Sequence, residues 1–267
     1  AITKKIDFAH ASKDDILVTI FNFLPRKRNE VTALAIDLPP ESLFSNILLE
    51  DTSGKRVECQ VMDSMPMGCN IDKVGFAKAL PVKRVLLNAA FQEIPAFGYK
   101  TFRVVWENND LNSKNEPNLA RGNVLENSFI RLEIEENGVF SLYDKRNKVT
   151  YYKLHQFSDT GESGNAWTPE RMGEKILLND AYDTVDIELV SNGHLKATMK
   201  VTLHTTLPVS ANESYTGRSE LKKAVSIESF ISITKSSPRV DIKTNFINEI
   251  KDHKLQIDFD FGTEIND

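Results

Sequence analysis

One stretch of this sequence gathers the side chains that sugar recognition needs. Within residues 155–171, two of the carboxylates, one of the amides and an indole stand among small and turn-forming residues. They are Asp159, Glu162, Asn165 and Trp167. Carboxylates and amides pair with vicinal hydroxyls, and an indole covers the apolar face of a pyranose. We interpret residues 159–169 as a loop that leaves a β-sheet, with these four side chains as candidates for substrate binding.

Two other interpretations of this stretch stay open. An ordinary polar loop between strands, anchored by Trp167, has the same composition. The carboxylate pair would also suit acid–base catalysis of the glycosidase kind, which requires two carboxyl groups about 5 to 10 Å apart across the scissile bond. Sequence spacing does not establish such a distance, so no catalytic residue is assigned.

Other chemistries find no support in the sequence. The five histidines are scattered, without His-x-His or His-x-x-x-His spacing, so no metal site is predicted. They are His10, His155, His194, His204 and His253. Nucleophile-elbow, phosphate-loop and dinucleotide-binding motifs are absent as well. The sequence therefore calls for no cofactor.

Composition narrows the class of protein. The chain has 267 residues with 40% hydrophobic and 27% charged positions, which is the range of folded globular proteins. A net charge of −5 disfavours nucleic acid and anionic membranes as partners. Cys59 and Cys69 are expected to be unpaired thiols in a reducing compartment. Since no signal-peptide core is visible, we expect a cytoplasmic location.

Apolar and polar residues alternate with a period of two in most of the chain, and long 3.6-residue periods are nearly absent. Turn signals separate the alternating segments, which recur every 8 to 15 residues or so, as in antiparallel sandwiches. The fold class is therefore predicted to be all-β, built from antiparallel β-sandwiches. The predicted strands cover residues 16–21, 31–36, 56–61, 75–80, 84–90, 99–107, 128–135, 185–190, 195–203, 224–234, 240–248 and 254–261.

A polar, Asn-rich stretch interrupts this alternation and predicts two units. Residues 1–107 form a small sandwich, residues 108–122 a linker or exposed loop, and residues 123–267 the first part of a larger sandwich. The core pattern of the second unit runs to residue 261 with no closing element after it. We therefore expect this chain to be a piece of a longer one.

Four ordered motifs resemble one family. Leu125–Ile134, followed by Asn137–Lys145, is similar to the opening of the C-terminal β-domain of glycoside hydrolase family 38, the α-mannosidases. The segments Ile20–Pro25, Ile94–Phe102 and Asp252–Leu255 resemble further motifs of that family in the same order.

The resemblance implies a fold and indicates which domain of the enzyme carries the catalytic residues. It implies a small β-domain followed by the start of a mutarotase-like super-sandwich, with the catalytic barrel absent. In this family the zinc ligands and the nucleophile belong to that barrel, so no catalytic residue, metal or cofactor is expected here, and zinc is expected in the missing domain. The parent enzyme would hydrolyse α-mannosidic bonds with retention, and this fragment alone would be inactive.

The resemblance also bears on the loop. Residues 163–169 fit the frame of a family motif whose tyrosine reaches toward the sugar from the β-domain side. Alignment on Pro169 places Trp167 against that tyrosine.

Three functional hypotheses follow. The leading one is a non-catalytic β-region that supports the barrel, contributes to the sugar-binding rim and meets an α-mannoside or oligosaccharide there. An independent carbohydrate-binding β-sandwich module is the alternative. A third is a structural domain that forms homo-oligomers through its β-edges.

Overall fold

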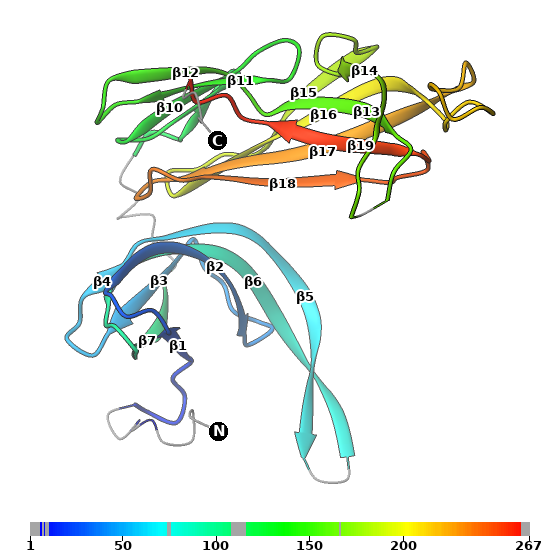
Figure 1. Cartoon of the computed structure of the whole chain (residues 1–267). Coiled ribbons are helices and arrows are strands. Elements are labelled where there is room, and N and C mark those ends of the chain that lie inside the picture. The colour runs from blue at the N-terminus through cyan, green and yellow to red at the C-terminus, as the bar shows by residue number, and fades with distance from the viewer. Residues whose placement is uncertain are drawn as a thin grey trace. The chain divides into compact units, whose positions relative to one another are not determined.

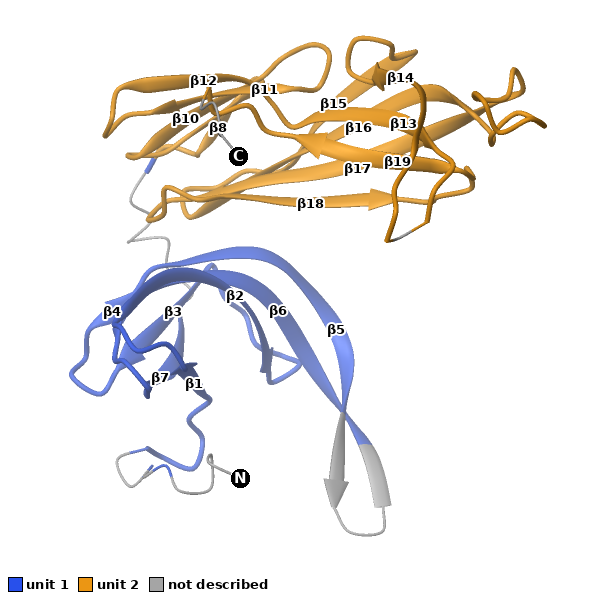
Figure 2. Cartoon of the chain, in the orientation of Figure 1, with its two compact units in different colours: residues 1–116 blue, residues 117–267 orange. Residues whose placement is uncertain are grey.

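The computed structural model describes Ile6, Phe8 and residues 11–73, 76–107, 116–165 and 167–262, with the backbone alone for 70–73 and 76–78. These residues form 19 strands and no helix, and the strands pair antiparallel throughout (Figure 1). The predicted all-β class is confirmed. No helix capable of crossing a membrane occurs in this described part of the chain. The chain divides into two compact units, residues 1–116 and 117–267 (Figure 2).

Unit 1 contains two antiparallel sheets with strand orders β1-β7-β3-β4 and β2-β6-β5. The strands are β1 Leu17–Asn22, β2 Arg28–Leu38, β3 Asn46–Asp51, β4 Arg56–Val57, β5 Cys59–Lys73, β6 Phe76–Ile94 and β7 Gly98–Glu107. The two strands predicted at 75–80 and 84–90 are one strand, β6, apart from residue 75, which lies outside the described residues. Pro81 does not interrupt β6, because β2 pairs with β6 only from Lys83 onward and leaves that edge open before it.

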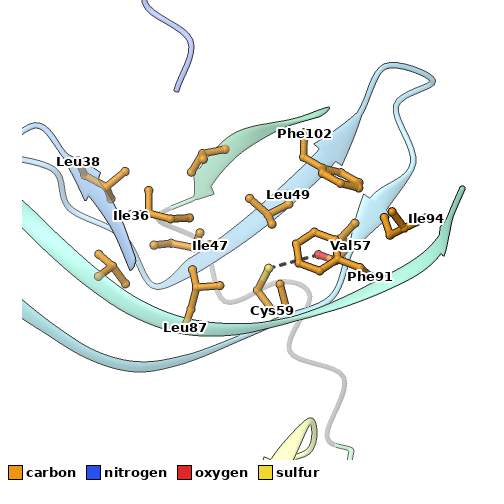
Figure 3. Packing of buried hydrophobic residues seen from close by; sticks show 13 residues of the cluster. Ile36, Leu38, Ile47, Leu49, Val57, Cys59, Leu87, Phe91, Ile94 and Phe102 are labelled. Atoms are coloured by element: carbon orange, nitrogen blue, oxygen red, sulfur yellow. Dashed lines mark hydrogen bonds between the residues drawn. The ribbon is translucent and has the colours of Figure 1, made fainter. Parts of the chain in front are cut away.

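The core of unit 1 lies between these two sheets (Figure 3). Alternate residues of β6, among them Leu87 and Phe91, pack against Ile47 and Leu49 of β3. Cys59 is part of this core, and burial raises the pKa of its thiol to about 12. Both cysteines are free, as predicted, and Cys59 donates a weak hydrogen bond to the Val57 carbonyl oxygen at 3.5 Å.

A buried amide holds the end of β1. Asn22 is 1% exposed, and its Nδ2 donates to the carbonyl oxygens of Arg26, Ile94 and Pro95 at 2.8, 3.2 and 2.9 Å. Its Oδ1 accepts from the Leu24 N–H at 3.0 Å. One side chain thereby joins the turn after β1 to the end of β6.

Unit 2 contains three antiparallel sheets, with strand orders β12-β11-β10-β9-β8, β14-β13-β19 and β15-β16-β17-β18. The first six strands are β8 Ala120–Arg121, β9 Val124–Glu126, β10 Ile130–Ile134, β11 Phe140–Asp144, β12 Val149–Leu154 and β13 Gln156–Glu162. The others are β14 Arg171–Leu177, β15 Thr184–Ser191, β16 Lys196–Pro208, β17 Lys222–Thr234, β18 Val240–Phe246 and β19 His253–Asp258.

The long sheet β15–β18 supports both smaller sheets. Toward one end, Met199 and Ile231 pack with Leu132 of β10 in one core cluster. Toward the other, Leu203 and Ile227 pack with Phe157 of β13 in a second cluster. Figure 1 shows the two smaller sheets side by side along the long one.

The hairpin predicted at the start of this unit is confirmed. Strand β10 pairs with β11 in a register that matches Leu132 with Leu142, and Gly138 in the turn has a φ of +82°. The predicted linker 108–122, in contrast, extends too far toward the C-terminus. Its residues 108–115 lie outside the described residues, but Leu119 and Ala120 are buried in a core cluster of unit 2, because β8 pairs with β9.

His155 is buried in an aromatic environment. It is 1% exposed, its ring lies 4.8 Å from that of Phe157 and 6.0 Å from those of Phe140 and Phe259, and neither ring nitrogen has a partner among the described residues. Burial lowers the pKa of His155 to about 4. The folded protein therefore holds a neutral imidazole where the unfolded chain would bind a proton.

Asn22→Asp should destabilise unit 1 by about 2 to 4 kcal/mol near neutral pH, because three carbonyl groups would lose a donor and face a carboxylate. Asn29→Asp is the matched control, since Asn29 acts as an acceptor for the Glu93 N–H and aspartate preserves that role. Urea unfolding followed by fluorescence measures the effect: Trp106 packs on the core of unit 1, whereas the other tryptophan, Trp167, is 92% exposed. Equal stability of the two variants would contradict the proposed role of the amide.

His155 should make unit 2 sensitive to acid. Its pKa is about 4 when folded and 6.5 in its ordinary state, so its effect is absent above 6.5 and stability falls as the pH decreases through 6.5 toward 4. Between about pH 7.5 and about pH 5 the loss should be roughly 2 kcal/mol. His155→Phe and His155→Asn should each remove this share of the pH dependence, and His204→Gln, on the surface, should retain it. Calorimetric unfolding measures it, and unchanged slopes in both variants would contradict the assignment.

Candidate functional site

The candidate loop joins β13 to β14 and is closed by its own backbone. The Ser163 N–H donates to the Glu170 carbonyl oxygen at 2.9 Å, and the Asn165 N–H donates to that of Thr168 at 3.1 Å. Trp167 is 92% exposed at the tip. The loop therefore presents its indole to solvent instead of burying it as an anchor.

Glu162 and Asn165 hold this loop while keeping polar atoms available. Oε1 of Glu162 accepts from the N–H groups of Gly164, at 3.1 Å, and of Glu170. Oδ1 of Asn165 accepts from those of Trp167 and Thr168 at 2.9 and 3.1 Å. These bonds fix which end of the Asn165 amide faces the backbone. Glu162 Oε2 and Asn165 Nδ2 have no hydrogen bond within the described residues.

Asp159 does not belong to the loop, and this part of the sequence interpretation is wrong. It lies within β13 and is 0% exposed. Its Oδ2 accepts from Arg218 Nη1 at 2.7 Å, and its Oδ1 lies 2.5 Å from His253 Nδ1. Because both carboxylate oxygens are occupied inside the protein, Asp159 is not available to a sugar at the loop.

Arg218 and His253 complete a buried charged cluster around Asp159. Arg218 also donates to the Pro208 carbonyl oxygen at 3.1 Å, and its Nε has no partner among the described residues. The second ring nitrogen of His253 lies 3.0 Å from Asn248 Oδ1, and that oxygen already accepts from the Ile250 N–H. Both ring nitrogens of His253 thus face side-chain oxygen atoms, one of Asp159 and one of Asn248.

Gly161 lets this cluster form next to the loop. A Cβ atom at this position would lie 2.5 Å from Arg218 Cδ and 2.5 Å from the Met172 carbonyl oxygen. Any larger residue would displace the arginine from Asp159 or separate β13 from β14. Residues 159–162 are therefore part of strand β13, and the close packing around position 161 requires glycine. The loop begins only after Glu162.

The described residues contain neither of the other two site types considered from the sequence. Asp159 is buried and Glu162 supports the loop, so they do not form an open pair of catalytic carboxylates. No group of three or more His, Cys, Asp or Glu side chains that could hold a metal ion occurs in the described part of the chain. These residues do not fit zinc. His10 lies outside the described residues.

Sequence reasoning missed Arg218 and the role of His253. His253 stood in a recognised motif, but as a lone histidine it carried no sign of a partner at position 159. Arg218 lies in a polar turn region, where a basic residue is expected to be solvated. The pairing of β13 with β19 brings position 159 next to His253, 94 residues further along the chain.

The fold and the loop define a class: an all-β region of stacked antiparallel sheets with an exposed aromatic loop and no gathered catalytic residues in its described part. Residues 125–267 match the domain described as "Glycosyl hydrolases family 38 C-terminal domain", and the chain belongs to that family. The resemblance seen in the motifs is thereby confirmed.

Solved structures and a curated protein agree with this assignment. A crystal structure of an alpha-mannosidase from Enterococcus faecalis V583 superimposes with a TM-score of 0.85 at 23% identity, over 98% of this chain and 33% of that one. A glycosyl hydrolase family 38 protein from Enterococcus faecalis gives 0.82 at 22% identity, over 96% and 34%. A Halalkalibacterium halodurans protein named "Putative mannosylglycerate hydrolase" is 21% identical over 236 residues.

This chain spans only part of these proteins. It covers 26% of the length of the Halalkalibacterium halodurans protein and about a third of each solved structure. At these identities the solved structures establish the fold of this chain.

Asp159→Ala should destabilise unit 2 by about 3 to 5 kcal/mol, because it leaves the buried Arg218 guanidinium without its counter-charge. Asp159→Leu combined with Arg218→Met should recover part of that loss, since it removes both charges together. Asp241→Ala, which breaks a surface pair with Arg239, is the control and should change little. Calorimetric unfolding provides the measurement. A cost for Asp159→Ala no larger than that of the control would show that the buried cluster does not hold the sheets together.

Proposed function

We propose that this chain is the non-catalytic β-region of an α-mannosidase, in which it supports the catalytic barrel and lends the loop 163–170 to the sugar-binding rim. The observation that carries the proposal is the match of residues 125–267 to the family's C-terminal domain. The chain's share of about a third in the solved structures supports the view that catalysis belongs to another part of the enzyme.

The loop supplies the chemistry of such a rim. Trp167 offers an apolar ring face to a pyranose, while Glu162 Oε2 and Asn165 Nδ2 offer an acceptor and a donor for its hydroxyls. Hydrogen bonds that backbone N–H groups of the loop donate to both side chains hold these atoms in place before the sugar arrives, which lowers the entropic cost of binding.

The expected reaction is hydrolysis of an α-mannosidic bond with retention of configuration, carried out by a carboxylate pair outside this chain. Zinc, where the enzyme binds it, would orient the sugar's hydroxyls there. The part played by the present residues is to bind and orient the sugar from the β-domain side.

Trp167→Ala and Asn165→Ala, made in the longer enzyme, should each lower kcat/KM on an α-mannoside by about tenfold, through lost stacking and a lost hydrogen bond. Trp167→Tyr should retain most activity because it keeps an aromatic face. Leu43→Ala, an exposed apolar position in unit 1, should have no effect.

The 267-residue chain alone should hydrolyse an aryl α-mannoside no faster than the buffer blank. Turnover by the isolated chain would refute the non-catalytic role. Values of kcat/KM within about twofold of wild type for both alanine variants, at unchanged stability, would remove the loop from the substrate site.

The exposed indole also favours a second candidate, an independent carbohydrate-binding module. Calorimetric titration of the isolated chain with α-linked mannotriose separates the two candidates. The module hypothesis requires saturable binding that Trp167→Ala abolishes, whereas a rim that is completed only by the barrel gives no heat attributable to Trp167.

A further inference from the structure

The outer face of the five-stranded sheet forms a concavity of about 930 Å³ on unit 2. Three adjacent strands line its floor, each with two outward residues at alternate positions. They are Arg131 and Glu133 on β10, Ser141 and Tyr143 on β11, and Thr150 and Tyr152 on β12. The register places Tyr143 between Arg131 and Thr150, so these side chains form one continuous surface.

A wall closes one side of this floor. Asn179 donates from Nδ2 to the Asn137 carbonyl oxygen at 2.7 Å, which fastens the segment after β14 to the β10–β11 turn. Asn179 is buried, and its Oδ1 accepts from the Phe157 N–H at 2.7 Å. Three residues further on, Tyr182 lines the concavity. The wall is therefore built into the fold.

The chemistry of the lining indicates which ligand it suits. Tyr143, Tyr152 and Tyr182 bring three aromatic rings to one concave surface, and Tyr152 is 64% exposed. Such rings, each with a polar hydroxyl at its edge, suit a ligand with both apolar faces and hydroxyl groups. A long apolar ligand is disfavoured, since polar side chains separate the rings.

Two carboxylates of the lining bond to other side chains of the same surface or its rim. Arg131 Nη1 donates to Glu133 Oε2 at 2.8 Å, and Ser141 Oγ donates to Glu135 Oε1 at 2.7 Å. Three carboxylates, those of Glu133, Glu135 and Glu136, stand against one guanidinium, which disfavours phosphates and other anions. A simple cation would compete with Arg131 for Glu133. Paired groups of this kind still offer acceptors and donors to the vicinal hydroxyls of a neutral sugar.

We propose that this concavity is a binding site for a neutral oligosaccharide, whose pyranose rings lie on Tyr143, Tyr152 and Tyr182 while Arg131 and Glu133 bind hydroxyls. The site is separate from the loop 163–170, which joins two strands of another sheet. It would hold a saccharide chain on the β-region without cleaving it. The choice of mannosides as probes rests on the proposed function, but the site itself does not.

The test is a titration of the 267-residue chain with α-linked mannotriose and, separately, maltotriose, followed by amide chemical shifts and calorimetry. At least one sugar should bind with a Kd in the millimolar range or below, with shifts concentrated on β10–β12 and near Tyr182. Tyr152→Ala and Tyr182→Ala should weaken this binding about fivefold or more. Tyr152→Phe should retain it, because the ring face remains.

Tyr215→Ala is the matched control, because Tyr215 is 60% exposed and lies in a turn outside the concavity. It should leave sugar affinity unchanged. Since Tyr152 and Tyr215 are both surface residues, neither substitution should unfold the chain, and the amide spectrum verifies this directly.

The outcomes are decisive in both directions. Binding of maltotriose but not mannotriose at this face would retain the site and count against a mannosidase as the proposed function. No binding of either sugar at about 20 mM, shifts confined to the loop 163–170, or equal losses in Tyr152→Ala and Tyr215→Ala would overturn the inference. Spermidine binding at this face that Glu133→Gln abolishes, with no sugar binding, would identify a cation site and overturn it as well.

Discussion

Unit 2 depends on the buried carboxylate of Asp159. Asp159 has no exposure to water, so its carboxylate must be compensated within the protein, and Arg218 and His253 provide the compensation. The two partners come from separate stretches of the chain, one from the turn region between β16 and β17 and the other from β19. This requirement ties β13 to β19 and to the turn region between β16 and β17.

The fold was predictable wherever one face of a strand is buried and the other is exposed to solvent. The β10–β11 hairpin shows this, since its apolar residues alternate strictly and a glycine sits at the turn that needs a positive φ. Strand β13 was not predicted, because its buried positions include the polar residues Ser158, Asp159 and Thr160, which the sequence pattern assigns to solvent. The buried cluster makes that burial tolerable, and its members are far apart in sequence.

In the candidate site, too, local features were predictable from the sequence, and features that depend on distant residues were not. The loop position of Asn165 and Trp167 was predictable from the sequence, because a polar loop with an indole is a local feature. Glu162 was placed in that loop too, but it is the last residue of β13. Asp159 was misplaced because its environment is set by Arg218 and His253, which lie 59 and 94 positions further along the chain. The tyrosine-lined concavity was invisible for a related reason: its floor combines three strands, and only their register brings Arg131, Tyr143 and Thr150 into one row.

The pairing of β13 with β19 also affects folding during synthesis, because β19 is made long after β13. His253 follows Asp159 by 94 residues. At synthesis rates of about 5 to 20 residues per second, β13 would wait roughly 5 to 20 seconds on the ribosome for its second neighbour. During that interval one edge of β13 stays unpaired and the aspartate lacks its histidine, so the nascent chain exposes a template for wrong strand pairing. This region should therefore depend more on chaperones during translation than hairpins such as β10–β11, whose two strands follow each other directly in the sequence.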